Sequence, residues 1–587
     1  MKTTADVLRE KYISYMVARG HAQIPSAPLV PENNPSLLFV NSGMFPLIPY
    51  LLGEEHPAGK RLCSIQKCVR TEDIDSVGNP FYHTFFEMMG HWSLGDYFKK
   101  EAIQITYDFL VNHLNLDPAK LSVTIFSGDE NAPFDSESKT AWLTAGIPEN
   151  RIYPLGASEN WWIAGNKGPC GTDSEVFMDT GKAPCSASCN PSCKCGKYFE
   201  IWNNVFMEFN KKEDGSLEPL KQKNVDVGIG VDRTATMLEG LDDNYKASHW
   251  KPLINLVEDI TQKRYEENTK SFRILADHAR AITFLLSENI APSNVQQGYI
   301  VRRIIRRSMR EELKLSAGGK VLLPLIEKII ADYGPTYPQL TKNRDLVLTL
   351  FKNECEKFAK TLVKGNVFFA KNLERFKKEG RISGKDAFDL YQSYGFPIEM
   401  TKELAAEQGL KVDEDSFSLT FTKHKESSRT ASKGLFKGGL AGDSEAETKY
   451  HTATHILHQA LRNLLGDTIS QKGSNITAER LRFDFSFPRK ITEEEITKLE
   501  EVVNGVITRN LPVACDTKSL DEARAAGALA FFAEKYGDKV KVYTVGDFSK
   551  EVCGGPHVTE TGQLGHFKII KEESAGAGIR RIKAILN

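Results

Sequence analysis

The chain has 587 residues, of which 41% are hydrophobic and 26% are charged, and its formal net charge at pH 7 is −1. This composition is that of an ordinary soluble globular protein, and the length predicts about three or four domains rather than one core. The first residues, MKTTADVLREKY, lack the apolar stretch of a signal peptide, and no run of about eighteen apolar residues occurs. We therefore expect a cytoplasmic protein without a membrane partner, in which any affinity for nucleic acid comes from local patches.

Residues 1–245 mix helical and strand-like stretches and are predicted to form one α+β domain. QKCVRTE and the aromatic-rich GNPFYHTFFEMMGHWSLGDYF predict two paired strands joined by a polar turn. Arg70 ends the first strand, and Phe86 and Met88 lie on the second. That arrangement can offer a guanidinium to a phosphate and a ring face to a purine. Ordinary hairpins carry the same residue types in these places, so the spacing alone leaves both interpretations open.

Four of the ten cysteines lie in the short segment CSASCNPSCKC, as Cys185, Cys189, Cys193 and Cys195. Four thiolates this close together can surround one tetrahedral metal ion. In a cytoplasmic chain, clustered cysteines bind metal more often than they form disulfides. The segment therefore predicts a structural zinc site, with four unliganded thiols as the alternative.

The string VDVGIGVDR, residues 225–233, places two glycines and Arg233 between a strand-like run and a helical segment. It differs from the dinucleotide fingerprint GxGxxG, and no P-loop GxxxxGK[ST] occurs in the chain. Glycine lets a ligand approach the backbone closely, and an arginine can pair with a polyphosphate. An ordinary strand-to-helix turn explains the string equally well.

Residues 246–421 are predicted to form a helical second domain, which contains an unusual concentration of arginines. At 100° per residue on a helix, five of them fall within an arc of about 140°: Arg302, Arg303, Arg306, Arg307 and Arg310. The opposite side is apolar, and no carboxylate stands among the five. We interpret them as a phosphate-binding face for a nucleic acid, against the simpler interpretation of a solvated charged face.

Residues 422–449 are polar, small and glycine-bearing and are predicted to be a linker before a last domain, residues 450–587. His451 and His455 lie four residues apart, on one face of a helix. Cys553 and His557 repeat this spacing, and the four side chains together suit zinc better than calcium or magnesium. No glutamate follows His451, so the general base of a His-Glu-x-x-His protease is missing.

Long strings in a fixed order resemble the alanyl-tRNA synthetase family: PSAPLVPENNPSLLFVNSGM, QKCVRTEDIDSVGNPFYHTFFEMMGHWSLGDYF, EIWNNVFMEFN, VDVGIGVDR, SNVQQGYIVRRIIRR, HTATHILHQALR and CGGPHVTETG. The resemblance covers nearly the whole chain. It implies ATP-dependent attachment of alanine to tRNA-Ala through an alanyl-adenylate, with hydrolytic editing of Ser-tRNA-Ala and Gly-tRNA-Ala. The implied fold is α+β and multidomain, with a class II antiparallel sheet flanked by helices, a helical tRNA-recognition domain and a zinc-containing editing domain.

The resemblance also implies roles for the residues of the first domain. Arg70 would bind the α-phosphate of ATP and Arg233 the γ-phosphate, with Mg²⁺ accompanying the nucleotide. Phe86 would stack on the adenine while the backbone of Met88 reads its edge. The alanine site would consist of one carboxylate for the ammonium group and a small pocket around the side chain: Asp226, Trp162, Asn203, Val205 and Gly228.

Two further groups of residues are implied in tRNA recognition and editing. Asn294 would read a G·U wobble pair in the minor groove of the acceptor stem, with Glu399 in place of the family's usual aspartate. A methyl-sized pocket rejects serine only weakly, by roughly a hundredfold, so a second hydrolytic site is expected. Zn²⁺ on the four C-terminal ligands and Gln471 would form that editing site.

The chain also departs from the family. The loop after Arg70 is short, and Phe81-Tyr82 replace an Arg-His pair, so we expect fewer contacts to ATP. The family's β-barrel before the editing domain and its C-terminal domain are not found, which predicts a reduced, monomeric synthetase. The alternative functions are a stand-alone editing hydrolase with a decayed synthetase domain and a non-catalytic RNA-binding regulator.

Overall fold

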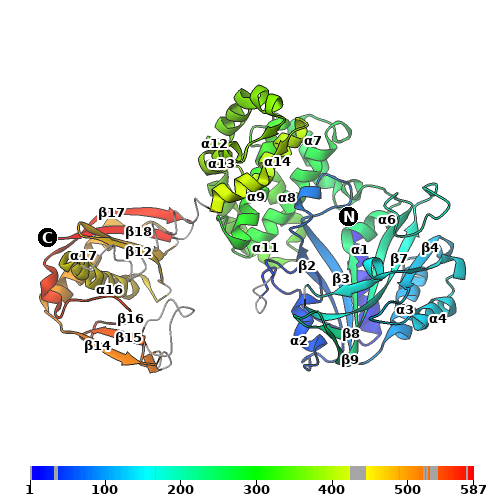
Figure 1. Cartoon of the computed structure of the whole chain (residues 1–587), viewed down its shortest axis with the longest axis horizontal. Coiled ribbons are helices and arrows are strands. Elements are labelled where there is room, and N and C mark those ends of the chain that lie inside the picture. Colours follow the sequence, from blue (N-terminus) through cyan, green and yellow to red (C-terminus); the bar gives the residue numbers. More distant parts are fainter. Residues whose placement is uncertain are drawn as a thin grey trace. The chain divides into compact units, whose positions relative to one another are not determined.

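A computed structural model describes residues 3–31, 37–165, 167–422, 444–467, 469–487, 489–519, 522–523, 526–528, 540–576 and 579–587. The chain divides into two units, Met1–Asn372 with Ser393–Met400 and Leu373–Gln392 with Thr401–Asn587 (Figure 1). The division falls inside the long helix α12 (Arg344–Glu379). It is therefore not one of the predicted domain boundaries, and the four-domain scheme stays a prediction.

The two strands predicted around the Arg70 turn form the centre of a nine-stranded sheet. β2 (Arg61–Val69) and β3 (Phe85–Leu94) pair antiparallel, with Lys67 opposite Glu87. The sheet continues through β9 (Leu217–Gly230), β8 (Tyr198–Lys211) and β7 (Gly168–Asp179) to β4 (Leu121–Phe126) and β5 (Ile152–Leu155). The short β1 (Ala22–Gln23) lies beside β2, and β6 (Trp161–Ile163) beside β7. Only the outer pairs β1–β2 and β4–β5 are parallel, so the predicted antiparallel class II sheet is confirmed.

Helices pack on this sheet because alternate strand residues are apolar. α1 (Thr4–Ala18), α3 (Lys99–Asp108) and α4 (Ser136–Ala145) surround a core in which Tyr12 and Phe109 are fully buried with Val225 and Val227 of β9. A capping box at Thr3 and Asp6 begins α1. α6 (Val231–Leu238) follows β9 directly.

The helical part of the first unit is built around one almost completely buried helix, α8 (Thr269–Ser287). It packs with α7 (Lys251–Thr261), α9 (Gln296–Lys314), α10 (Leu322–Tyr333) and α11 (Pro338–Lys342). The shared core includes Phe272, Leu275 and Leu286 of α8. Farther along the chain, α13 (Gly384–Tyr394) and α14 (Ile398–Glu407) lie among the short strands β10 (Arg381–Ile382) and β11 (Lys411–Val412).

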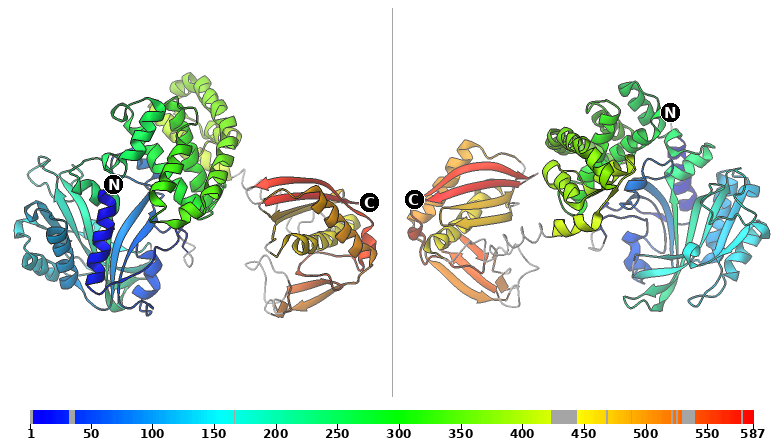
Figure 2. Two further views of the ribbon diagram at one scale, coloured as in Figure 1. Left: turned by 180° about the vertical axis from the view of Figure 1, so that it is seen from behind. Right: turned by 45° about the horizontal axis from the view of Figure 1, so that its top comes forward.

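Residues 444–587 form a four-stranded antiparallel sheet with two helices on one face (Figure 2). Its strands are β12 (Gln471–Thr477), β13 (Arg480–Ser486), β18 (Ile579–Leu586) and β17 (Phe567–Gly576). α16 (Glu445–Leu465) and α17 (Glu493–Thr508) cover Leu481, Phe483 and Ile582. A second sheet contains β14 (Val513–Lys518), β15 (Val540–Val545) and β16 (Ser549–Val552).

The predicted linker, residues 422–449, needs correction at its end. Residues 423–443 lie outside the described residues, but α16 already begins at Glu445. The Ser444 hydroxyl accepts from the Glu447 backbone N–H, and the Glu447 carboxylate accepts from the Ser444 N–H. This capping box starts the helix five residues before the predicted domain boundary. In the described parts of the chain, no helix has the length and apolar character needed to span a bilayer.

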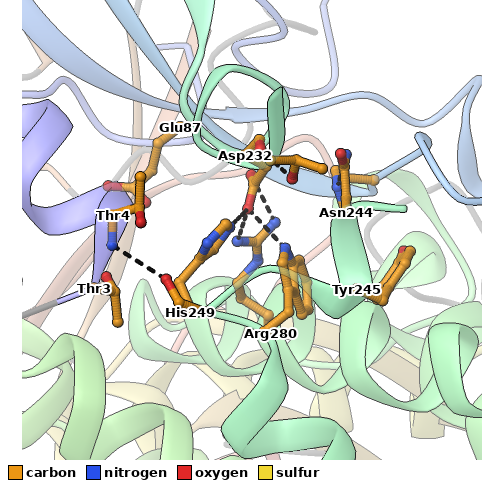
Figure 3. Close-up of polar contacts among 12 residues, drawn as sticks. Thr3, Thr4, Glu87, Asp232, Asn244, Tyr245, His249 and Arg280 are labelled. Atoms are coloured by element: carbon orange, nitrogen blue, oxygen red, sulfur yellow. Dashed lines mark hydrogen bonds and ion pairs between the residues drawn. The ribbon is translucent and has the colours of Figure 1, made fainter. Parts of the chain in front are cut away.

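Helix α8 is joined to the nine-stranded sheet by a fully buried ion pair (Figure 3). Arg280 Nη1 donates to Asp232 Oδ1 at 2.8 Å, and its Nη2 donates to Oδ2 at 3.1 Å and to the Phe85 carbonyl at 2.7 Å. His249 Nε2 and Trp250 Nε1 donate to the same carboxylate at 3.0 and 2.9 Å. These donors hold the pKa of Asp232 well below its ordinary value despite the opposing effect of burial. One side chain of α8 thus fixes both the start of β3 and the first turn of α6.

A second residue of α8 holds the turn before β3. Asp277 accepts from the Thr84 backbone N–H at 3.0 Å and from His83 Nδ1 at 3.2 Å. His83 Nε2 in turn accepts from Asn244 Nδ2 at 2.8 Å. On the next buried position of β3, Glu87 pairs with Arg9 of α1 and accepts from the Tyr337 hydroxyl at 2.7 Å. Glu87 points away from Phe86 and Met88, because successive strand residues face opposite sides.

We expect Arg280→Met to lower the free energy of unfolding of the first unit by about 3–5 kcal/mol, because it leaves a buried carboxylate without its counter-ion. Arg344→Met is the matched control in the same unit, since Arg344 pairs with Glu327 while both side chains are 47% exposed. Its cost should stay below about 1 kcal/mol. Chemical denaturation followed by tryptophan fluorescence measures both. Equal costs for the two variants would contradict the importance of the buried pair.

Candidate functional site

A pocket lies where β3, β8 and β9 meet α6. It is lined by Arg70, Asp73, Phe81, His83, Phe86, Met88, Glu200, Gly228, Gly230, Asp232, Arg233 and Asn244. They include the five residues that the resemblance implies for ATP binding, Arg70, Phe86, Met88, Gly228 and Arg233. Two of the lining residues, His83 and Asp232, are those held by α8. The pocket wall therefore depends on the helical part of the unit as well as on the sheet.

Arg70 follows the last residue of β2 and is held at its guanidinium and at its backbone N–H. Its Nε donates to the Asn41 carbonyl at 3.2 Å, and its guanidinium lies 4.8 Å from the centre of the Phe86 ring. The backbone N–H of Arg70 donates to the Thr84 carbonyl at 3.0 Å. A planar cation with its remaining N–H groups facing the pocket can donate to a phosphate.

Arg233 lies in the first turn of α6, opposite a group of carboxylates that the sequence analysis missed. It pairs with Glu200 of β8 at 2.7 Å. Asp173 and Glu175, on β7, complete the group. Burial and the neighbouring carboxylates raise the pKa of Asp173 to about 8 and that of Glu175 to about 10. Asp173 Oδ1 is buried and has no hydrogen-bond partner.

Carboxylate oxygens are ligands that Mg²⁺ prefers, and the shared negative charge of this group would be relieved by a divalent cation. The signal in the sequence was weak, because DSE and FE on two strands are also ordinary strand residues. The pairing of β7 with β8 brings Glu200 near enough to Asp173 and Glu175 to raise the pKa of both.

Asp226 of β9 is a buried carboxylate two residues before Gly228, which lines this pocket. Its one hydrogen bond from the described residues comes from Trp92 Nε1, at 2.6 Å. Burial raises its pKa to about 7, although the bond from Trp92 acts in the opposite direction. A buried carboxylate that lacks a cationic partner in the protein is suited to bind an ammonium group from a ligand.

The other predicted alanine-site residues gather around Asp226. Strand register places Val205 opposite Asp226 and Asn203 opposite Gly228. Trp162, on β6, packs against the apolar cluster that contains Val205. The two glycines Gly90 and Gly228 face each other across β3 and β9. A Cβ on Gly90 would lie 2.6 Å from the Trp92 ring, and one on Gly228 3.0 Å from Met88 Sδ, so both positions require a small residue.

The five arginines of α9 do not form the predicted phosphate-binding face, and that interpretation is wrong. Arg303, Arg307 and Arg310 are buried. Arg302 and Arg306 both pair with Glu354 of α12, at 3.1 and 2.6 Å. Arg310 pairs with Glu311, the next residue of the helix, at 3.5 Å, whereas Glu354 comes from a segment far away in the sequence, so the absence of a carboxylate among the five arginines was misleading.

These arginines instead hold two loops. Arg303 pairs with Asp75, and Arg307 donates to the carbonyls of Ile74 at 2.6 Å and Val77 at 3.2 Å, in the turn between β2 and β3. Arg302 donates to the side-chain oxygen of the exposed Asn294, and Tyr299 donates to Glu399 Oε2 at 2.9 Å. The structure thus brings Asn294 and Glu399 to the same half of α9.

The four predicted zinc ligands of the C-terminal part lie together. One donor atom from each of His451, His455, Cys553 and His557 is within 4.8 Å of the other three. α16 presents the two histidines one turn apart, and Cys553 follows the end of β16. Cys553 Sγ is 3.4 Å from His451 Nε2. A Cβ on Gly555 would lie 2.3 Å from His451, so the glycine allows the loop to approach the helix.

Neighbouring groups orient these ligands. His451 Nδ1 donates to the Pro556 carbonyl at 3.0 Å, and His557 Nδ1 lies 3.1 Å from the Thr452 hydroxyl. Glu551 Oε2 is 3.6 Å from His455 Nδ1. Burial lowers the pKa of His455 to about 3 and that of His557 to about 2, so both rings are neutral, as metal ligation requires. Sequence reasoning missed Thr452 and Glu551, although SKEVCGG placed a carboxylate near Cys553.

The structure supports two other predictions only in part, those for Gln471 and for the four clustered cysteines. Gln471 is the first residue of β12, opposite Phe485, and its proposed place in the editing site stays a prediction. In the loop between β7 and β8, the sulfurs of Cys185, Cys189 and Cys195 lie within 4.8 Å of one another. Hydrogen bonds donated by the Cys185 thiol to the sulfurs of Cys189, Cys195 and Cys193 raise the pKa of Cys185 to about 12. Three of the four thiols thus form the group, and the fourth lies near it.

Comparison with known proteins agrees with this geometry. The family described as tRNA synthetases class II (A) matches residues 7–477, and the threonyl and alanyl tRNA synthetase second additional domain matches residues 540–583. Alanine–tRNA ligase from Treponema denticola is 51% identical over 593 residues, covering 99% of each chain. The enzyme of that name from Treponema pallidum is 48% identical and covers 99% of this chain and 98% of its own.

A more distant relative shows what is missing here. Alanine–tRNA ligase from Petrotoga mobilis is 35% identical over 703 positions, covering 99% of this chain and 80% of its own. Because this chain has 587 residues, that relative carries segments that this chain lacks. The reduced length is shared with the Treponema denticola protein, which matches end to end. The chain therefore belongs to the alanyl-tRNA synthetase family of class II tRNA synthetases, as one of its reduced members.

Proposed function

We propose that the protein attaches alanine to tRNA-Ala in two steps, through an alanyl-adenylate, and hydrolyses Ser-tRNA-Ala and Gly-tRNA-Ala at the cluster around Cys553. The observation that carries the proposal is the position of the buried Asp226. It lies on the same strand that leads into Arg233, so a site for an ammonium group adjoins a site for a polyphosphate. An amino acid and ATP can therefore meet in one pocket. The family and the named relatives agree with this chemistry.

In the first step, the alanine carboxylate attacks the α-phosphorus of ATP and pyrophosphate leaves. Asp226 holds the ammonium group, which directs the carboxylate toward the nucleotide. Arg70 donates to the α-phosphate and Arg233 to the γ-phosphate, where negative charge is present or develops. Phe86 stacks on the adenine and the Met88 backbone reads its edge. Asp173, Glu175 and Glu200 are the donors that would hold Mg²⁺, which supplies further positive charge when bound.

In the second step, the terminal ribose hydroxyl of the tRNA attacks the adenylate. Asn294 and Glu399 read the G·U pair in the shallow minor groove of the acceptor stem, which an A-form helix leaves accessible. Arg302 and Tyr299 hold the two readers in place. The arginines of α9 therefore act in tRNA recognition by positioning other residues, and they do not bind phosphate themselves.

Editing follows from the size of the alanine pocket. Trp162, Asn203 and Val205 surround a space that excludes large side chains, but an added hydroxyl is rejected by only about a hundredfold. The four C-terminal donors fit Zn²⁺, since three neutral imidazoles and one thiol converge. When bound, Zn²⁺ would supply a contact for the seryl hydroxyl, because a site with four protein ligands positions a substrate rather than generating hydroxide. Gln471 is proposed to line this site.

Three further parts of the proposal concern the whole chain. The four-domain scheme, with boundaries at 245, 421 and 449, describes its functional parts, with the last boundary moved to Ser444. A structural zinc ion binds at Cys185, Cys189, Cys193 and Cys195. The protein acts as a cytoplasmic monomer, which sedimentation at micromolar concentration would test. The alternative of a stand-alone editing hydrolase is disfavoured, because Arg70 and Arg233 line the pocket and Asp226 lies two residues before Gly228, which also lines it.

The main proposal predicts selective charging. Purified protein should attach alanine to tRNA-Ala with a G·U pair and lose nearly all charging on a G·C variant. Seryl-tRNA should accumulate with Cys553→Ala and not with the wild type. Acid-gel separation of charged tRNA measures all of these products. Hydrolysis of added Ser-tRNA-Ala without any alanine attachment would instead establish the stand-alone hydrolase.

The pKa of Asp226 predicts a pH dependence. Alanine binds the ionised carboxylate, so kcat/KM for alanine in pyrophosphate exchange should fall roughly tenfold from pH 7.5 to pH 6 as Asp226 becomes protonated. The variant Asp226→Asn should bind alanine weakly at every pH in this range. A flat wild-type profile between these values would show that Asp226 does not hold the ammonium group.

Metal analysis separates the two zinc sites. The wild type should contain two zinc ions per chain. Cys185→Ser with Cys189→Ser should contain one and still edit, whereas Cys553→Ala should contain one and fail to edit. Cys515→Ser is the matched control, because Cys515 is an exposed free thiol outside both groups. A wild type with one zinc ion, retained in the Cys185 and Cys189 variant, would refute the structural site.

A further inference from the structure

The four-stranded sheet of the C-terminal part has one face that its helices leave uncovered. Leu481, Phe483 and Ile582 point into the core beneath α16 and α17. The residues between them on β13 and β18 point to the opposite face, since side chains alternate along a strand. Figures 1 and 2 show both helices on the same side of the sheet. Among the described residues 444–587, no helix lies on the other side.

Three cationic side chains lie next to one another across this uncovered face. Strand register places Arg482 of β13 opposite Lys583 of β18, and Lys583 opposite Lys571 of β17. These three residues are called the cationic row. Neighbouring strands are about 4.8 Å apart, so the row places three positive charges within about 10 Å. Like charges directly opposite each other destabilise a sheet.

The acidic residues of the face do not balance these charges. Glu573 pairs with both Lys571 at 2.7 Å and Lys583 at 3.0 Å. Asp484 accepts two hydrogen bonds from Arg581, at 2.7 and 2.8 Å, and lies 3.6 Å from Arg482. Two carboxylates therefore pair with four cations: Lys571, Lys583, Arg581 and Arg482.

Arg480 adds a fifth cation on the same face, two residues before Arg482. Its Nη1 and the Nε of Arg482 are buried without a hydrogen-bond partner. The pKa of Arg482 is lowered by burial and by the charges of Arg581 and Arg480, against the effect of Asp484. An anion bound to this face would remove both the repulsion and the unsatisfied donors.

We propose that this face is a docking surface for the sugar-phosphate backbone of tRNA, with the cationic row at its centre. The inference rests on the proposed editing function, which requires the 3′ end of a charged tRNA to reach the cluster around Cys553 in the same part of the chain. The row itself consists of cations, and the amide next to it, Asn475 opposite Arg482, accepts a hydrogen bond from Arg480 at 3.4 Å, so the face suits a sequence-independent polyanion. The surface holds the tRNA while its end enters the editing site. It thereby supplies the nucleic-acid contact that α9 does not provide.

The test compares two triple variants of the full-length protein. The row variant carries Arg482→Gln, Lys571→Gln and Lys583→Gln. The control variant removes three exposed cations elsewhere in residues 444–587: Lys498→Gln, Arg509→Gln and Lys541→Gln. Both lose the same net charge, and none of the six residues is a proposed zinc ligand. Thermal unfolding establishes that both are folded.

Binding of uncharged tRNA-Ala is measured by fluorescence anisotropy over a series of KCl concentrations. For the row variant, the slope of log K against log salt should fall by about two, since each phosphate contact contributes roughly 0.7–0.9. In hydrolysis of added Ser-tRNA-Ala, its KM should rise about tenfold with kcat unchanged, because the reacting site is intact. The control variant should match the wild type in both.

A row variant that equals the control in slope and KM overturns the proposal. The proposal also fails if the melting temperature of the row variant rises while its tRNA binding is unchanged, since the three charges would then only destabilise the sheet. It fails likewise if the row variant loses affinity for an acidic peptide but not for tRNA. If the wild type itself does not hydrolyse Ser-tRNA-Ala, the proposed editing function fails. The salt slope of tRNA binding still decides whether this face binds RNA.

Discussion

The pocket between β3, β8, β9 and α6 depends on the buried pair of Arg280 and Asp232. A fully desolvated carboxylate is stable only when strong donors surround it, and Asp232 receives them from Arg280, His249 and Trp250. Because Arg280 also donates to the Phe85 carbonyl, the same guanidinium fixes the strand that carries Phe86 and the helix that carries Arg233. The distance between the groups proposed to bind adenine and phosphate is therefore set by a helix outside the sheet. The sheet and the helical part of the first unit therefore build the pocket together.

Asp226 shows the opposite arrangement. It is as deeply buried as Asp232, yet its described partner is the single indole N–H of Trp92. The pKa values differ accordingly, since that of Asp232 is held low by a cation whereas that of Asp226 is raised to about 7. Two carboxylates six residues apart thus differ in pKa through the presence or absence of one guanidinium. Among the described residues Asp226 has no counter-ion, and this is the property expected of the proposed partner of a substrate ammonium group.

Most features that could be predicted from the sequence have a short range. The His451 and His455 pair needs only the pitch of one helix, and the two strands around Arg70 need only one hairpin. Cys553 is an exception, because it lies about a hundred residues farther along and was placed with the histidines by its residue type and spacing alone. The group of Asp173, Glu175 and Glu200 was missed because strand pairing between β7 and β8 brings it together. The start of α16 was misplaced because the composition of the linker hid the capping box at Ser444. Partners distant in sequence could not be predicted where no matching set of residue types marked them.

The arginines of α9 and the cationic row show that the fold decides whether a cluster of cations is neutralised. A helix with five arginines and no carboxylate among them had the composition of a nucleic-acid surface, but Glu354 and Asp75 reach it from other segments and Glu311 of the same helix pairs with Arg310. On the outer sheet face the cations are spread over three strands, so no short stretch of sequence looks unusual. There the local partners are too few, since Glu573 and Asp484 are each shared. Whether a cluster of cations can bind nucleic acid therefore depends on how many cations remain after each carboxylate within reach has been paired with one. That number can be counted only when the fold is known.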